Sequence, residues 1–467
     1  MKRLFLLISL SIFFVACANK SMTRYEELSE PLEKGGFPAA IDKVVKKQDD
    51  LYGSNSEFLY HFDLATLYHY NGEWEKSADE FEKAKQVYED LYTRSVSNEA
   101  AAILTNDNMR PYRARPFEVL ALYEMNIINY LAMKDIDGAL VEVRAADIAL
   151  QQLYQKNNKK VNDAGFLRYL IAIVYDMEGE KDDAAISYYK TAQAYEEDPC
   201  KLPAEAQAFI ADYLKQRGRE DDLKSLKFPN SGTVQTPEAA RNANGEVIVV
   251  GYAGHSSILG EWMLSGTYVR GGVLNLMGKS AETGKVESIT LPAPAISTSA
   301  RGGTTVSITI ALPERKSIKS QVHNLEVKLD DYPGIFKPEV VADISKNLDK
   351  NLSEEKSTTL TRTAIRVATR TFAAQEAKKA METDNVWLNL LTNIGTDVAA
   401  AQMEQADLRV GLFLPNDIRM SRLPAAPGMH KVSVIATNEY GNAVKRFDYT
   451  VNVKPGNKAW IVVPAIK

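Results

Sequence analysis

Residues Phe58 to Asp90 read FLYHFDLATLYHYNGEWEKSADEFEKAKQVYED, and this stretch decides the fold of the N-terminal half. The spacing of its small and apolar residues predicts two antiparallel helices joined by a tight turn. These residues are Ala65, Tyr68, Gly72, Trp74, Phe81 and Ala84. Gly72 is expected to end the first helix, since a residue without Cβ tolerates positive φ there. Ala65 and Ala84 allow the two backbones to approach, while Phe81 and Trp74 fill the gap between them.

The same spacing returns twice further along the chain. Between Arg168 and Tyr195 it is carried by Ala172, Tyr175, Gly179, Ala184 and Tyr188. Between Met125 and Leu150 it is carried by Tyr130, Ala139, Val143 and Ala146, with Lys134 at the turn position. Three matches in one register resemble tetratricopeptide repeats, in which helix pairs stack into a solenoid.

The repeats are expected over residues 25–228. An insertion over Ser95 to Pro116 interrupts the stack, because the equivalent positions Ala65 and Ile127 lie 62 residues apart. Helix pairs over residues 25–50 and 203–227 are expected to cap it. Stacked helix pairs form a concave groove that binds peptides or partner helices. The candidate polar residues of this groove are His61, Asp63, Asn126, Asn129 and Arg168. The alternative is that each of them lies on a solvated helix face.

Residues 229–244 have no helical or strand periodicity and are predicted to be a linker. The pattern of residues changes after this linker. Residues 245–467 then contain β-branched runs with glycine turns; these runs are Glu246 to Val250, Thr304 to Ile310, His323 to Leu329 and Lys431 to Ala436. A helical insert is expected over about 338–402, with Arg362, Arg366 and Arg370 on a solvated face.

Residues 428–467 hold three strand-like runs divided by two glycine-containing turns, which predicts an antiparallel meander at the edge of a small β-sandwich. The predicted fold class is therefore an α+β multidomain chain. An N-terminal α-helical solenoid resembling tetratricopeptide repeats precedes a mixed, mainly antiparallel β domain with a helical insert.

The N-terminal residues have the three-part layout of a secretory signal. Lys2 and Arg3 are positive, residues 4–15 are apolar residues and serines, and Ala16 is small. As a helix, twelve residues rise about 18 Å, against the roughly 30 Å of hydrocarbon that a permanent span must cross. Residues 1–16 are therefore expected to be a cleaved signal peptide.

The segment Phe14-Val15-Ala16-Cys17 resembles a bacterial lipobox. The resemblance implies cleavage between Ala16 and Cys17, acylation of Cys17, and a lipidated tether over residues 17–24. Two or more acyl chains make membrane anchoring durable. Ala18, rather than Asp, follows the cysteine, and by resemblance to lipoprotein sorting signals this favours the outer membrane. The alternative is an ordinary signal peptide with an incidental cysteine.

The distribution of charge argues against nucleic-acid binding, and the cysteine content argues against an internal disulfide. Loss of Lys2 and Arg3 shifts the formal net charge from −5 to −7, and no basic stripe of the kind a nucleic-acid binder needs is present. Cys200 is the only other cysteine, so lipidation of Cys17 leaves no pair for an internal disulfide. Cys200 is expected to be a small buried apolar residue, and a reactive thiol is the alternative.

The best candidate for catalysis is Ser256, which follows the strand-like run 247–250 and a glycine turn. Gly254 and Ser256 match a nucleophile elbow, but Ile258 stands where the elbow needs a second glycine. Asp331 or Asp417 with His430 would supply the acid and base in the correct chain order.

The histidines are scattered rather than spaced as metal ligands, and neither glycine pair, Arg270-Gly-Gly or Arg301-Gly-Gly, precedes a phosphate-cradling helix. No metal, cofactor or small-molecule substrate is therefore expected. Trp262 and Tyr268 are candidate stacking residues for a carbohydrate- or peptidoglycan-binding module.

The most distinctive stretch is Ala406-Asp407-Leu408-Arg409, followed by Leu414-Pro415 and then by Pro427-Gly428-Met429-His430. This order resembles an uncharacterised family of bacterial lipoproteins with tetratricopeptide-like repeats. The resemblance implies an envelope lipoprotein and a link to cell-wall synthesis. From the residues alone, Asp407, Arg409 and His430 are expected to form a buried ion network that fixes the insert against the sheet.

Taken together, these features favour a non-catalytic interaction scaffold. The repeats would recruit an envelope protein, and the lipid on Cys17 would hold the pair at the membrane. The alternatives are a serine hydrolase centred on Ser256 and a peptidoglycan- or carbohydrate-binding module.

Overall fold

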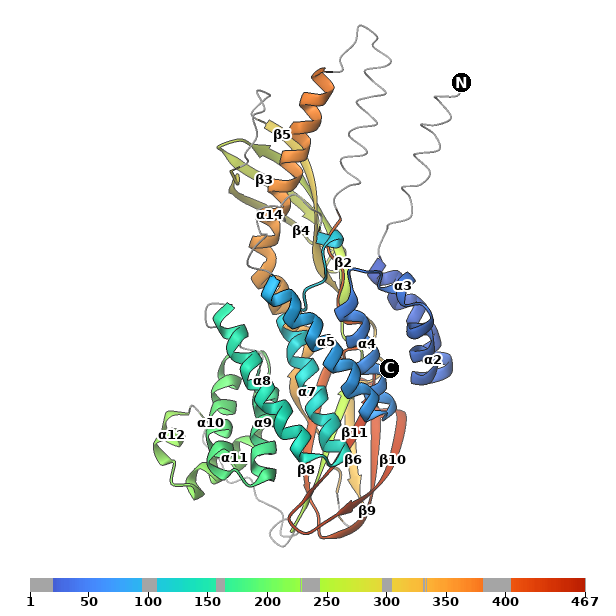
Figure 1. Cartoon of the computed structure of the whole chain (residues 1–467), viewed down its shortest axis with the longest axis vertical. Coiled ribbons are helices and arrows are strands. Elements are labelled where there is room, and N and C mark those ends of the chain that lie inside the picture. The colour runs from blue at the N-terminus through green and yellow to red at the C-terminus, as the bar shows by residue number, and fades with distance from the viewer. Residues whose placement is uncertain are drawn as a thin grey trace.

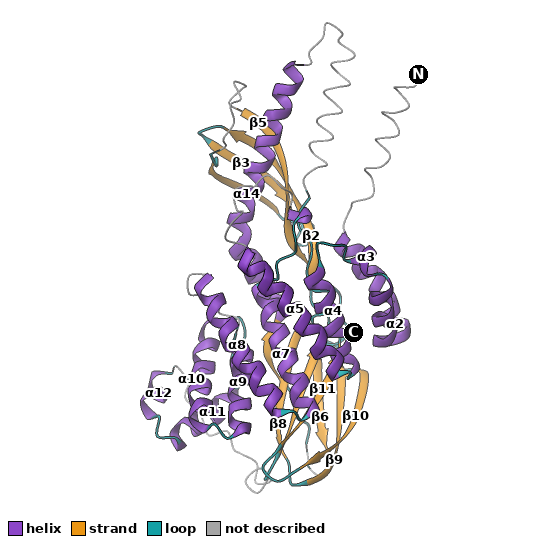
Figure 2. Cartoon of the chain, in the orientation of Figure 1, coloured by secondary structure: helices purple, strands orange, loops and turns teal. Residues whose placement is uncertain are grey.

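The computed structural model describes residues 20–94, 107–156, 164–226, 228, 244–295, 305–330, 332, 334–380 and 405–466. The expected signal peptide, its cleavage site at Ala16 and Cys17, and most of the expected linker lie outside these residues. Within them the chain is α+β, with helices first and β-sheets afterwards, as predicted (Figures 1 and 2).

Three antiparallel helix pairs follow one another in the N-terminal half. They are α4 (Glu57–Asn71) with α5 (Trp74–Arg94), α7 (Pro116–Met133) with α8 (Ile136–Lys156), and α9 (Gly165–Glu178) with α10 (Lys181–Glu197). The first helix of each pair ends at Gly72, Lys134 or Gly179, with φ of 76°, 64° and 88°. The positive φ expected at Gly72 is therefore present, and the residues at the equivalent turn positions, Lys134 and Gly179, adopt the same left-handed conformation.

The repeat-packing residues occupy the interfaces between paired helices. Ala65, Phe81 and Ala84 are fully buried, as are Ala172, Ala184 and Tyr188. Tyr68, Trp74 and Tyr175 are partly buried and pack against the same core. Further helices lie outside the pairs; α2 (Lys20–Lys46) and α3 (Gln48–Leu51) precede them, the 3-10 helix η1 (Asp107–Met109) lies between the first two pairs, and α11 (Ala204–Gln216) and α12 (Glu220–Ser225) follow them.

Two sheets pack face to face beneath the helices. The first has the order β11-β1-β8-β7 and contains β1 (Glu246–Ala253), β7 (Glu339–Asp343), β8 (Asp417–Pro424) and β11 (Lys458–Ala465). The second has the order β10-β9-β6 and contains β6 (Asn324–Leu329), β9 (Gly428–Thr437) and β10 (Ala443–Val453). Alternate residues of β1 point to opposite faces: Val247 and Val249 join the second sheet, whereas Ile248 and Val250 join the helices.

Two expectations for this region are wrong. β9 and β10 pair antiparallel as a hairpin, but β11 leaves the meander and pairs parallel with β1 in the other sheet. β11 forms an edge of the first sheet, where Val462 joins the core beneath the helices and Ile461 and Val463 join the core shared with the second sheet. The predicted helical insert also begins with a strand, β7, and its residues 381–402 lie outside the described ranges.

A third sheet has the order β4-β3-β2-β5 and contains β2 (Ile258–Val269), β3 (Val273–Lys279), β4 (Val286–Pro292) and β5 (Thr305–Lys316). The helix α14 (Ile344–Ala380) lies along this sheet (Figure 1). Its residues Leu360, Ala364, Ala368 and Phe372 recur every four positions and pack on the sheet's apolar face.

The helical and β-rich halves share one hydrophobic core. Buried residues of the helix pairs, of β1, β8 and β11, and of the segment 406–414 belong to a single cluster. The N-terminal helices therefore cover one face of the first sheet, with the second sheet on its other face.

Candidate functional site

The inner face of the helix pairs is occupied by the chain's own residues 405–416, which we call the inserted segment. Leu408, Val410, Leu412, Phe413 and Leu414 of this segment are all buried. They lie in the core shared by the helices and the first sheet. The concave groove expected to receive a partner is therefore filled.

Two buried carboxylates bind the backbone of the inserted segment. Asp63 Oδ1 accepts the Leu412 N–H at 2.8 Å, and Glu118 Oε1 accepts the Gly411 N–H at 2.8 Å. The hydroxyls of Tyr52 and Tyr112 donate to the second oxygens of Asp63 and Glu118 at 2.9 and 2.7 Å. Burial raises the pKa of Asp63 to about 7 and also raises that of Glu118.

Arg409 ties the start of the inserted segment to the helical half. Its guanidinium donates to both oxygens of Asp407 at 2.8 and 2.7 Å. It also donates to the carbonyls of Asn55, Arg110 and Asp107 at 2.9, 3.0 and 2.9 Å. The expected Asp407–Arg409 pair is therefore present, but it binds the helical half rather than fixing the insert against the sheet.

His430 does not join that pair. It lies on β9, where its Nε2–H donates to the Ala426 carbonyl at 2.7 Å and its Nδ1 is 3.9 Å from Asp330 Oδ1. Leu414 and Pro415 lie at the end of the inserted segment, where the Leu414 carbonyl accepts the Ser256 N–H at 2.9 Å. The motif therefore divides between the inserted segment and the second sheet.

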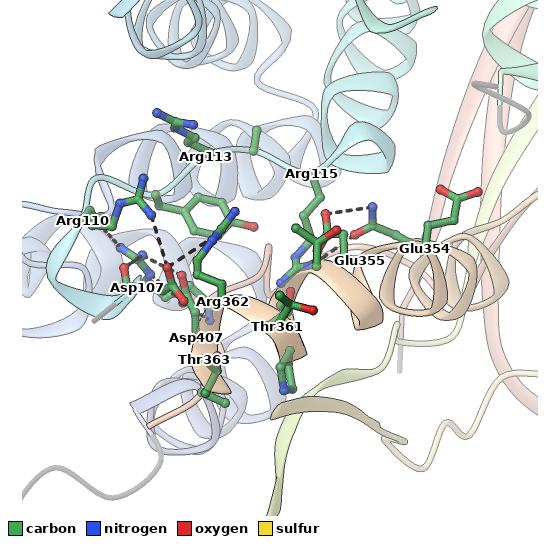
Figure 3. A pocket seen from close by; sticks show the side chains of 18 of the residues that line it. Asp107, Arg110, Arg113, Arg115, Glu354, Glu355, Thr361, Arg362, Thr363 and Asp407 are labelled. Carbon is green, nitrogen blue, oxygen red and sulfur yellow. Dashed lines mark hydrogen bonds and ion pairs between the residues drawn. The ribbon is translucent and has the colours of Figure 1, made fainter. Parts of the chain in front are cut away.

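A cavity of 1460 Å³ lies between the start of α7, the helix α14 and the beginning of the inserted segment (Figure 3). We call it the arginine cavity. Its charged lining comprises six arginines and four carboxylates; these are Arg110, Arg113, Arg115, Arg362, Arg366 and Arg409, and Asp107, Glu354, Glu355 and Asp407. Among the residues that the structure describes, the formal charge of the lining is therefore +2, in a chain whose net charge is −5.

Three of these arginines converge on the single carboxylate of Asp107 (Figure 3). Arg110 lies 3.3 Å from Oδ1, Arg366 3.4 Å from Oδ2, and Arg362 3.8 Å from Oδ1. On the other side of the cavity Arg115 makes a 2.7 Å pair with Glu355 and donates to Asn351 at 3.0 Å.

The expectation of a solvated arginine face on α14 is wrong for Arg366. Its side chain is only 1% exposed, and it lies against Asp107 and Thr363. Asp107 sits in the interrupting segment 95–116, whose tertiary position the sequence did not predict. A cluster of three arginines between positions 110 and 115 was the one local signal for this site.

The other predicted groove residues make contacts within the helical layer. His61 pairs with Glu80 at 2.6 Å, and Arg168 lies 3.3 Å from Asp147. Asn126 and Asn129 are buried, and Asn129 Oδ1 accepts the His69 Nδ1–H at 2.7 Å. Of the five, only Asp63 touches a bound peptide segment, and that segment belongs to the same chain.

Ser256 is not arranged as a nucleophile. It is buried, and its Oγ makes a 3.5 Å contact with the Ser257 carbonyl. The neighbouring His255 directs Nδ1 to the Ser256 carbonyl at 2.7 Å rather than to the hydroxyl. Asp417 is paired with Arg419 at 2.6 Å. The described residues therefore bring neither His255 nor His430 to the Ser256 hydroxyl.

The rings of Trp262 and Tyr268 are both covered by α14. Lys356 Nζ lies 4.6 Å above the Trp262 ring, and Phe372 packs edge-on to Tyr268 at 6.1 Å. Both aromatic residues are buried and so are not available as stacking platforms for a sugar.

Cys200 is buried as expected, and its Sγ lies 3.2 Å from the Val340 carbonyl. Burial raises its pKa to about 12. In the described part of the chain, no cluster of three or more His, Cys, Asp or Glu side chains is placed to hold a metal ion. None of the helices described there has the length and apolar composition of a membrane span.

Comparison of the chain with protein-family models, curated proteins and solved structures gives no match.

Proposed function

We propose that this protein is a non-catalytic scaffold of the bacterial cell envelope, anchored through a lipid on Cys17. Its helix pairs are tetratricopeptide-like repeats that recruit a protein partner at the outer membrane, with a link to cell-wall synthesis. The repeat interpretation is supported by the three pairs, each with a left-handed residue between its helices and alanines at the helix contact.

The observation that carries this proposal is the difference between the two faces of the helical layer. The inner face is closed by the inserted segment and the first sheet, so a partner must use another surface. The outer face bears apolar side chains on α8: Val141 is 67% exposed and Ile148 is 58% exposed. Seven residues apart, they lie on one side of the helix.

The outer face extends from α8 to α10. Arg144 donates to Glu180 at 3.2 Å and so joins the middle of α8 to the start of α10, which bears the exposed Ile186. Apolar side chains rimmed by such charged pairs are typical of protein interaction surfaces. We therefore place the docking surface on the outer face of α8 and α10.

A pull-down from detergent-solubilised envelopes tests this placement. The bait is the full mature chain, because a fragment containing only the repeats would expose the core that the sheet covers. The test variant is Val141→Glu with Ile148→Glu. The matched control is Met277→Glu with Val286→Glu, whose side chains are 58% and 65% exposed on the third sheet.

We expect the wild type and the control to retain the same envelope protein, and the α8 variant to lose it, because charged side chains resist desolvation. Equal recovery by both double variants would contradict the docking surface. Labelling of Ser256 by a serine-reactive fluorophosphonate would contradict the non-catalytic assignment.

The lipid anchor is tested by radioactive palmitate labelling of cells that express the wild type or Cys17→Ala. We expect incorporation in the wild type alone. Incorporation that persists in Cys17→Ala would contradict the anchor.

A further inference from the structure

The third sheet has one covered face and one open face. The helix α14 packs on the covered face, where Leu274 and Leu276 of β3 are fully buried (Figure 1). The residues between them along β3 point to the other side, where Val273, Asn275 and Met277 are exposed. We call this side the open face. It consists of alternate residues over 263–269 of β2, 273–279 of β3, 286–292 of β4 and 305–309 of β5.

The open face is almost without charge. Its described positions hold Ser, Thr, Asn, Met, Val and Pro side chains, and Lys279 is the one charged residue among them. Charged residues make up 25% of the chain and are found mostly at protein surfaces, so an ordinary surface of this size would carry several. Depletion of charged residues distinguishes the centre of a protein interface from the rest of a surface.

The polar side chains of the open face are paired with each other across neighbouring strands. Ser265 Oγ lies 3.0 Å from Thr309 Oγ1, and the Thr290 hydroxyl donates to Asn275 Oδ1 at 2.9 Å. Covering a polar group costs free energy mainly when its hydrogen bond is lost. Because these groups already have partners within the face, another surface can cover them at little cost.

Apolar side chains stand among these polar pairs. They are Met263 and Val273, each 44% exposed, Met277, 58% exposed, and Val286, 65% exposed. Removing such side chains from water contributes about 25 cal/mol for each Å² of apolar surface. The open face therefore gains free energy from its apolar groups and loses little from its polar groups when it is covered.

We propose that the open face binds the open face of a second copy of this chain, so that two third sheets pack face to face about a two-fold axis. In such a pair the same surface is used by both copies. A charged face would repel its own copy, whereas a face that is nearly neutral does not. Packed sheets lie about 10 Å apart, which allows side chains such as Met277 to interdigitate.

The area of the open face indicates how strong this pairing is. Four strands about 4.8 Å apart, each about seven residues long at about 3.3 Å per residue, cover roughly 440 Å² in projection, or roughly 900 Å² for two copies. This is at the lower limit of specific protein interfaces. We therefore expect a weak dimer with a Kd on the order of 10 μM.

The open face is separate from the outer face of α8 and α10, where we place the envelope partner. The two surfaces share no residue, so the failure of one proposal does not decide the other. The variant Met277→Glu with Val286→Glu changes the open face alone. It should be monomeric and should still retain the envelope partner.

Sedimentation equilibrium measures the association of the full mature chain, carrying Cys17→Ala so that no lipid micelle contributes. The test variant is Met277→Glu. The matched control is Met429→Glu, because Met429 is 62% exposed but lies on β9 of the second sheet. We expect a Kd at least about tenfold higher for Met277→Glu, since two carboxylates would meet where water is excluded, and the wild-type Kd for Met429→Glu.

A mixture of Met277→Glu and Met277→Lys gives a result that loss of folding cannot imitate. Met277 is close to the middle of the open face, so its counterpart in the second copy should lie near it. Each variant alone should be monomeric. Their mixture should associate at least about tenfold more tightly than either alone, because opposite charges then meet.

Three results would overturn the proposal. They are a wild type that stays monomeric at every concentration, equal weakening by Met277→Glu and Met429→Glu, and no recovery of association in the mixture. If a monomeric wild type binds phosphatidylcholine vesicles and Met277→Glu does not, the open face belongs to a membrane surface instead.

Discussion

Replacement of Arg409 by methionine should destabilise the whole protein, because this side chain joins its two halves. Methionine keeps most of the apolar stem and removes the guanidinium. The change deletes two contacts to Asp407 and three to backbone carbonyls of the helical half. The Arg409 side chain is only 10% exposed, so water replaces few of these contacts.

The expected loss follows from the type of interaction. Removing one partner of a buried ion pair costs about 3–5 kcal/mol, since the other charge is left uncompensated. Each carbonyl left without a donor adds to this cost, up to about 1–3 kcal/mol where water cannot reach it. Asp407 retains some solvent contact, which limits the penalty. We therefore expect a decrease of about 3–5 kcal/mol in the free energy of unfolding.

Urea unfolding followed by both circular dichroism and tryptophan fluorescence measures this change. Trp74 begins α5 and Trp460 lies on β11, so the fluorescence reports on both halves. A shared core predicts that the two signals change together. The control is Arg446→Met, whose pair with Asp448 is exposed, and it should leave stability unchanged. A loss below about 1 kcal/mol for Arg409→Met would refute the role of this residue.

Three further predictions concern buried residues. Burial raises the pKa of Asp63 from 3.8 to about 7, so the folded state holds one more proton than the unfolded state between these pH values. The free energy of unfolding of the wild type, relative to that of Asp63→Asn, should therefore fall by up to about 4 kcal/mol as pH rises from about 4 to about 7. Urea unfolding at several pH values measures this change. Gly411→Ala should lower the free energy of unfolding in urea by about 1–3 kcal/mol, because the new Cβ would lie 2.6 Å from the Phe62 ring. Gly260→Ala is the control and should lower it less, because its Cβ would meet nothing closer than 3.6 Å. Cys200 should resist iodoacetamide in the native state and react on unfolding, as mass spectrometry will show; rapid native alkylation would contradict its raised pKa.

Local structure was predicted well wherever neighbouring residues determine it. The helices end at Gly72, Lys134 and Gly179, where the repeat spacing places the turns, and Gly72 has the positive φ expected of it. The strand-like runs that begin at Glu246 and His323 correspond to β1 and β6. In both cases the pattern of apolar residues and turn residues is local, so a single sequence contains it.

Long-range pairing was not predicted, because it depends on which surfaces meet. The parallel pairing of β11 with β1 joins residues more than two hundred positions apart in the chain. Arg366 has the spacing of a solvated residue, yet it is buried against Asp107 from a distant segment. Trp262 and Tyr268 were likewise candidates for ligand stacking from the sequence, but α14 covers both rings in the structure.

The candidate site was predicted only in part. Asp407 and Arg409 were expected to form an ion network with His430, and the structure contains the Asp407–Arg409 pair without His430. Glu118 was not identified, because a glutamate in the first turn of a helix is usually explained as favourable for the helix dipole. Its actual partner, the Gly411 N–H, comes from the other half of the chain.

The most direct test of this account is hydrogen–deuterium exchange at the amides of Gly411 and Leu412. If Glu118 and Asp63 bind these amides inside the helical layer, both should exchange as slowly as the amides in the centre of β1. Exchange as fast as that of the exposed strand β4 would show that the inserted segment leaves the inner face open. A partner would then have access to the concave groove, and this result would contradict the placement of the docking surface on the outer face of α8 and α10.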